Sequence, residues 1–158
     1  MSKAVMLSIR PKWVEKIANG EKTIEVRKTR TKLATPIKCY IYCTQPKYPH
    51  KDFISTDYPK PQFYGGGKVI GEFTCDQFWI GTPHNTNLLF CMAACMDGFD
   101  TEKYAKGKTL YGWHISDLRI YDTPKELSEF TGLRDTKFGA APYEIKRAPQ
   151  SWCYVKEG

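Results

Sequence analysis

Apolar and polar residues follow two different periods along the first third of the chain. Residues 4–9 form a short apolar run that is typical of a buried strand. Residues 11–20 place apolar side chains at helical spacing, and the segment begins with proline and ends at glycine. Residues 22–27 and 38–44 alternate, which predicts strands with one apolar and one polar face. The pattern therefore predicts a strand, a helix and two further strands.

The later part of the chain mixes strands with helices. Thr123, Pro124 and Glu126 form a helix start signal, with a capping threonine, proline at the first position and glutamate at the third. Strands and helices do not alternate strictly, which favours an α+β domain around a bent or closed sheet. The predicted elements are a strand over 68–80 with a bend at Gly71, a mostly apolar and buried helix over 85–96, a short helix over 101–105, a strand over 109–121, a helix from Thr123 to about Gly132, and a last strand over 150–156.

An irregular segment separates the two parts. Prolines and the run Gly65–Gly67 forbid regular structure across most of residues 45–67. Its basic and aromatic residues suit phosphate contact and base stacking, or the aromatics pack on the domain body. The chain has 158 residues, enough for one ordinary domain, and shows no repeat or linker. We expect one domain over 1–158, with 45–66 as a variable long loop.

Charge is distributed unevenly over the chain, whose formal net charge is +7. Residues 1–70 hold 14 Lys or Arg against 5 Asp or Glu, whereas residues 71–158 hold 10 against 12. Such asymmetry suggests a basic face that meets a polyanion. A solvated surface that keeps the protein in solution is the alternative.

The six cysteines do not predict a disulfide framework, because secreted frameworks are usually shorter, richer in cysteine and preceded by an export signal. Cys39 and Cys43, like Cys91 and Cys95, have three residues between them, a gap that zinc sites allow. Their neighbours are apolar, each pair would share one face of its element, and buried thiols behave as small hydrophobes. We expect no metal and no other cofactor.

Several functional classes find no support in the sequence. No apolar run approaches the roughly 20 residues that span a bilayer. The apolar stretch within residues 1–10 is too short for the hydrophobic region of a signal peptide. We therefore expect a cytoplasmic protein without a membrane partner. There is no P-loop, nucleophile elbow or histidine–glutamate zinc motif, and His50, His84 and His114 make no ligand spacing.

The segment 20–27, Gly-Glu-Lys-Thr-Ile-Glu-Val-Arg, resembles the Gly-x-Lys-x-x-Glu-x-Arg motif of ASCH domains. The opening Leu7–Pro11 and the late segments Gly112–Ile115 and Ala148–Trp152 are also similar to that family. The resemblance spans essentially the whole chain, apart from the variable loop.

The resemblance to ASCH domains implies a PUA-like β-barrel of about six strands with flanking helices, and a cleft beside the first helix. Members are thought to bind RNA, often in translation or RNA processing. One branch hydrolyses the amide of N4-acetylcytidine with a lysine and a threonine three residues later, and other ASCH proteins have been linked to ribonuclease activity. Lys22 matches that lysine, but Glu25 stands where the threonine would be.

The chemistry of the motif also follows from its residue types. Lys22 and Arg27 bring positive charge to a strand edge, where it suits a phosphate or a carbonyl oxygen. Glu25 shares the strand face with Arg27, and it could orient the arginine or accept a hydrogen bond from a base amino group. The alternative is an ordinary ion pair on a solvated face.

The predicted function is an RNA- or nucleotide-binding ASCH module with a basic cleft that acts in RNA processing or translation regulation. The alternative is a hydrolase, either a ribonuclease or an amidohydrolase on a modified nucleoside such as N4-acetylcytidine. The sequence does not decide between the binding module and the hydrolase, and it does not identify protein partners. The expected ligand-binding residues are Ser8, Arg10, Lys22, Glu25, Arg27, Tyr42 and His114; for an enzyme, Lys22, Glu25, Tyr42 and Ser151 would be catalytic.

Overall fold

The computed structural model describes residues 2–45, 66–82 and 87–158. Nearly all of the predicted variable loop 45–66 lies outside these residues, as do His50 and His84. The chain divides into two compact units. Unit 1 comprises Met1–Glu15, Lys38–Phe73 and Leu118–Gly158, and unit 2 comprises Lys16–Ile37 and Thr74–Asp117.

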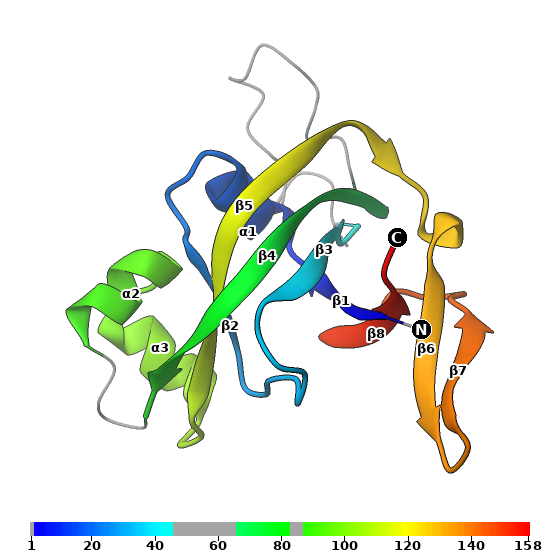
Figure 1. Ribbon diagram of the computed structural model, residues 1–158. Coiled ribbons are helices and arrows are strands. Elements are labelled where there is room, and N and C mark those ends of the chain that lie inside the picture. Colours follow the sequence, from blue (N-terminus) through cyan, green and yellow to red (C-terminus); the bar gives the residue numbers. More distant parts are fainter. Residues whose placement is uncertain (1, 46–65, 83–86) are drawn as a thin grey trace. The chain divides into compact units, whose positions relative to one another are not determined.

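Strands dominate the described part of the chain (Figure 1). The elements are β1 (Lys3–Ile9), α1 (Pro11–Ala18), β2 (Ile24–Arg27), β3 (Ile37–Cys43), β4 (Lys68–Gly81), α2 (Leu88–Ala94), α3 (Gly98–Ala105), β5 (Leu110–Lys125), the 3-10 helix Leu127–Glu129, β6 (Thr131–Thr136), β7 (Gly139–Glu144) and β8 (Trp152–Lys156). None of these helices is both long and apolar enough to cross a bilayer.

The eight strands are hydrogen-bonded in the order β2-β5-β4-β3-β1-β8-β6-β7. A sheet of strands with helices confirms the α+β prediction. The predicted barrel of about six strands is wrong, since the described strands form an open order that ends at β2 and β7. Two of the additional strands, β6 and β7, form a hairpin with little apolar alternation, so the sequence pattern did not reveal them.

Unit 1 is built around β1, which pairs in parallel with β3 and antiparallel with β8. Every residue from Ala4 to Ile9 is buried, so both faces of β1 are covered, and this explains why residues 4–9 lack alternation. The buried core of this unit consists of Ala4, Met6, Tyr40, Val69, Tyr121, Ile145 and Val155.

Unit 2 contains β2, which pairs antiparallel with the first half of β5. Ile24 lies opposite His114, and Val26 lies opposite Gly112. A side chain at Gly112 would come within 2.7 Å of the Ile24 Cδ1 atom, so glycine leaves the room that Ile24 fills. The buried core of this unit consists of Ile24, Val26, Phe90, Ala94, Ala105 and Leu110.

Helices α2 and α3 of unit 2 begin at other residues than predicted, and α2 is also less buried than predicted. The helix predicted over 85–96 is shorter, and only one of its faces is buried, since Leu88, Leu89 and Met92 are exposed. The short helix begins at Gly98 because Asp97 and Asp100 form a capping box there, with Asp100 N donating to Asp97 Oδ1 at 2.7 Å.

The helix predicted from Thr123 to about Gly132 is wrong. The strand β5 continues to Lys125, a single 3-10 turn follows, and β6 begins at Thr131. The helical turn begins after Glu126 and not after Thr123. Glu126 N donates to Glu129 Oε2 at 2.7 Å, and this bond caps the 3-10 turn Leu127–Glu129. Directly after this turn, the ring of Phe130 packs edge-on against Tyr40 at 4.9 Å, so the chain leaves the helical path.

Candidate ligand site on strand β2

Unit 2 brings the three charged residues of the motif together. Lys22 is 2% exposed and Glu25 is 5% exposed. Arg27 Nη2 lies 3.5 Å from Glu25 Oε1, and the side chains of both residues are largely covered. Charges that are removed from water need partners, because solvent no longer screens them. The motif is therefore a buried charge cluster and not an ion pair on a solvated face.

Lys22 holds the end of helix α2. Its Nζ atom donates to Ala94 O at 2.5 Å, and Thr23 N donates to Ala93 O at 2.8 Å. The last carbonyls of a helix lack partners within the helix and carry its negative dipole end, which a cation stabilises. Burial lowers the pKa of Lys22, and the negative charge of Glu25 offsets part of this effect.

Glu25 has an acceptor that the described residues leave unused. Its Oε1 atom faces Arg27, whereas Oε2 is buried and has no hydrogen-bond partner among the residues that the structure describes. A buried acceptor without a partner costs about 1–3 kcal/mol, and native proteins hold few of them. This oxygen is a place where a ligand N–H or O–H would be stabilising.

Tyr104 of α3 lies beside the same charges. Burial raises the pKa of Tyr104, and the charges of Arg27 and Glu25 act on its hydroxyl. The residue is 37% exposed, and Lys28 Nζ lies 4.9 Å from the centre of its ring. The sequence analysis missed Tyr104. Locally it is an ordinary residue in the last turn of a short helix, and only the fold brings it to β2.

His114 is not part of this cluster. Because it lies opposite Ile24 in the β2–β5 ladder, its side chain is on the other face from Glu25, which lies opposite Trp113. His114 Nδ1 is 2.6 Å from Asp76 Oδ1, and its ring stacks on Trp79 at 5.7 Å.

The remaining predicted residues lie in unit 1. Ser8 is opposite Tyr42 in the β1–β3 ladder, and its backbone N–H donates to Ser151 O at 3.0 Å. Its hydroxyl donates to Pro149 O at 2.6 Å. Arg10 is exposed at the start of α1. Burial raises the pKa of Tyr42, so its hydroxyl stays protonated at neutral pH. These residues belong to unit 1, whereas the charge cluster belongs to unit 2.

The cysteines are free thiols, four of them buried. Burial raises the pKa of Cys43 to about 12 and that of Cys75 to about 11. Cys91 lies in α2, but Cys95 follows the helix in the left-handed conformation with φ of 56°, so the pair does not share one helical face. Among the described residues, no three His, Cys, Asp or Glu side chains are placed to hold a metal ion.

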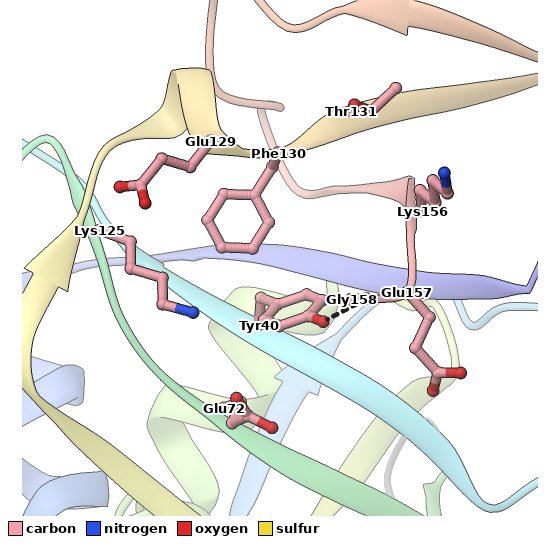
Figure 2. Close-up of a pocket in the computed structure, with 9 residues that line it drawn as sticks. All are labelled: Tyr40, Glu72, Lys125, Glu129, Phe130, Thr131, Lys156, Glu157 and Gly158. Carbon is pink, nitrogen blue, oxygen red and sulfur yellow. Dashed lines mark hydrogen bonds between the residues drawn. The ribbon is translucent and has the colours of Figure 1, made fainter.

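Unit 1 also contains a pocket of about 350 Å³ (Figure 2). None of the residues that the sequence predicted for the site lines it. The lining residues are Tyr40, Glu72, Lys125, Glu129, Phe130, Thr131, Lys156, Glu157 and Gly158. Glu72 Oε2 is 2.7 Å from Lys38 Nζ, and Tyr121 Oη donates to Glu72 Oε1 at 2.8 Å. The carboxylate of Glu72 is thus engaged within the fold, which marks it as a structural group.

Replacing Glu72 with glutamine should lower the free energy of unfolding by about 1–2 kcal/mol at pH 7. Burial raises the pKa of Glu72, but the bonds from Lys38 and Tyr121 outweigh it, so the net shift is below the ordinary value of 4.5. A depressed folded pKa stabilises the protein above the unfolded pKa, and this contribution is lost as pH falls through the folded value. The difference between the proteins should therefore shrink in acid.

Urea unfolding at pH 7 and at pH 3 measures this effect. Glu126→Gln is the matched control, because Glu126 forms an exposed ion pair with Lys68 at 2.9 Å. It should change stability little at either pH. A Glu72→Gln protein as stable as this control at pH 7 would contradict the structural role.

Comparison with known proteins supports the same fold and motif. Residues 7–74, which include the segment 20–27, match the ASCH domain. No curated protein sequence matches the chain.

Three solved structures share the fold, all of an ASCH protein from Zymomonas mobilis. The first is 17% identical, covers 98% of this chain and 88% of its own, and has a TM-score of 0.67. A tyrosine-to-phenylalanine mutant has 16% identity, coverages of 99% and 92% and a TM-score of 0.60. A serine-to-alanine mutant has 17% identity, coverages of 98% and 89% and a TM-score of 0.64. At this level of identity the likeness establishes the fold alone.

Proposed function

We propose, from the premise that residues 7–74 belong to the ASCH domain family, that the cluster of Lys22, Glu25, Arg27 and Tyr104 binds a nucleobase of RNA or of a free nucleotide. The observation that carries the proposal is the buried Glu25 Oε2 atom without a partner among the described residues. Amino groups of nucleobases are donors that carboxylates recognise. Such a donor would remove the cost of the unused acceptor.

The cations of the cluster suit the rest of such a ligand. Arg27 lies beside the carboxylate, and a guanidinium can donate to a ring nitrogen, a carbonyl or a phosphate. Basic residues predominate in the first 70 positions, which favours a ligand with negative charge. A base with an attached phosphate therefore matches both the acceptor and the cations.

Tyr104 supplies an aromatic surface at the same place. Bases stack on aromatic rings with little dependence on sequence, and each stack contributes about 1–3 kcal/mol. Because Glu25 Oε2 is buried, a ligand reaches it only when a neighbouring side chain moves. Tyr104 is 37% exposed, whereas the side chain of Arg27 is 11% exposed. We therefore propose that Tyr104 swings aside and then stacks on the bound base.

Glu25→Gln should weaken the binding of ligand by about 10- to 100-fold, because it removes a charged acceptor from a buried hydrogen bond. Isothermal titration with cytidine, adenosine and guanosine monophosphates, and fluorescence anisotropy with a labelled single-stranded RNA, measure this weakening. The control is Glu21→Gln, four residues away, whose carboxylate forms an exposed pair with Lys16 at 3.3 Å.

The control should keep wild-type affinity. If Glu25→Gln and Glu21→Gln bind the ligand with equal affinity, Glu25 does not contact the ligand, and water is the partner of its Oε2 atom. If the wild-type protein binds none of these probes, the proposed function fails.

A hydrolase on the same ligand class is the second candidate. One observation favours it: burial lowers the pKa of Lys22, as in lysines that act as a base or nucleophile. The position three residues later holds Glu25 instead of a threonine, so the carboxylate would have to activate water. Chromatography of the monophosphates and of N4-acetylcytidine after incubation with the protein, and a gel of the RNA, test this candidate, since unchanged compounds in all of them mean binding alone.

A further inference from the structure

The hairpin of β6 and β7 ends in a tight turn (Figure 1). Thr136 pairs with Gly139, so only Lys137 and Phe138 lie between the strands. Thr136 Oγ1 donates to Gly139 O at 2.7 Å and accepts from Phe138 N at 3.2 Å, and Gly139 has φ of 105°. These bonds fix the turn. They leave Phe138 89% exposed, more than any other large apolar side chain described.

Two cations of the hairpin lie over aromatic rings. Lys137 Nζ is 5.2 Å from the centre of the Phe138 ring, and the Arg134 guanidinium is 4.7 Å from that of Tyr143. The Tyr143 ring lies against Gly132, where a Cβ atom would come within 2.3 Å of it. The Tyr143 ring is therefore packed against the sheet, and the exposed Arg134 guanidinium lies over it. Cations beside flat rings form the combination that phosphates and bases require.

The charge of the hairpin also favours an anionic partner. The exposed charged side chains of the hairpin itself, residues 131–144, are Arg134, Asp135, Lys137 and Glu144, and the exposed Lys146 and Arg147 follow it in the chain. Asp135 already forms an ion pair with Lys3, which neutralises it. The hairpin thus has two cations, Arg134 and Lys137, against one uncompensated carboxylate, Glu144, and two further cations follow it directly in the sequence. A partner that is negatively charged and has flat rings at regular spacing would meet both features.

We propose that this hairpin binds a single RNA strand, with Phe138 stacked on a base and with Arg134 and Lys137 on the flanking phosphates. None of these residues belongs to the cluster on β2, so the inference goes beyond the proposed function. It implies that the physiological ligand is an RNA strand that extends past a single nucleotide.

Phe138→Ala tests the stacking. The affinity for a labelled, unstructured 12-nucleotide RNA should fall roughly tenfold, as expected when one base no longer stacks. Phe99→Ala is the matched control, because Phe99 is 74% exposed but lies on α3 in the other unit. Both variants should keep the wild-type melting temperature, since neither ring is buried. Equal RNA affinity of the two variants would overturn the proposal.

The double variant Arg134→Ala and Lys137→Ala tests the phosphate contacts. The slope of log K against log salt should become shallower by about 0.7 for each phosphate that the variant no longer neutralises. An unchanged slope would overturn the phosphate assignment.

The same variants separate this proposal from the site on β2. Phe138→Ala should leave the affinity for a nucleoside monophosphate unchanged, whereas Glu25→Gln should lower it. If the protein binds monophosphates but not the 12-nucleotide RNA, the hairpin proposal fails and the function proposed for β2 stands. If Phe138→Ala weakens RNA binding while Glu25→Gln changes neither RNA nor monophosphate affinity, the hairpin is the RNA contact and the function proposed for β2 fails.

Discussion

Lys22→Ala is expected to destabilise the protein by about 3 kcal/mol and to abolish ligand binding. The change removes a buried ammonium that bonds the end of α2 through Ala94 O, and it leaves the nearby charges of Glu25 and Arg27 to each other. Breaking a buried charge interaction on one side costs several times more than breaking a surface pair. Urea unfolding and titration with a nucleoside monophosphate measure the two effects.

Lys16→Ala is the control for Lys22→Ala. Lys16 belongs to the same unit, but its side chain is 41% exposed, and its ion pair with Glu21 at 3.3 Å is largely open to solvent. It should unfold at nearly the wild-type urea concentration and bind normally. If Lys22→Ala behaved in the same way, Lys22 would not stabilise α2.

The pH dependence of Lys22→Ala has a defined sign. Burial lowers the pKa of Lys22 below its ordinary value of 10.5, so the folded protein releases this proton at a lower pH than the unfolded chain. Between the two values the unfolded chain binds more protons, and the stability that Lys22 confers on the wild type rises with pH. Unfolding curves recorded from pH 7 to pH 10 should therefore show the gap between wild type and variant widening.

Gly71→Ala is expected to destabilise unit 1 by about 3 kcal/mol or to prevent folding. A Cβ atom at this position would lie 2.5 Å from Arg119 O and 3.2 Å from Ile120 Cα. Both are backbone atoms of the neighbouring strand, so rotation of a side chain cannot relieve the clash. Thermal unfolding followed by circular dichroism measures the destabilisation.

Gly98→Ala provides the comparison for Gly71→Ala. Nothing lies within 4 Å of a Cβ atom at Gly98, and the residue opens α3. Alanine is the better helix former, so this variant should melt at or slightly above the wild-type temperature. Equal melting of the two glycine variants would show that β4 and β5 separate easily at Gly71.

Local pattern was sufficient where each residue's neighbours in sequence decided its environment. Apolar runs and helical spacing located β1 and α1, and alternation located β2 and β3 to within a few residues. The motif in residues 20–27 also indicated a resemblance to ASCH domains, and the ASCH domain model matches residues 7–74. Side-chain period and turn residues carry this information within a few positions, so no tertiary contact is needed to read it.

Tertiary structure decided which side chains meet and which are buried. The sequence left open an ion pair on a solvated face for the motif, yet Lys22 and Glu25 are buried within unit 2. Tyr104 lies beside these residues although it belongs to a helix about 80 positions later in the sequence. Phe130 packs on Tyr40, and the segment predicted as a helix forms only a 3-10 turn before it. Strand pairing likewise decided that the described strands form an open sheet instead of the predicted barrel, with the β6–β7 hairpin at one end. These outcomes depend on contacts between distant segments, and a local period carries no information about them.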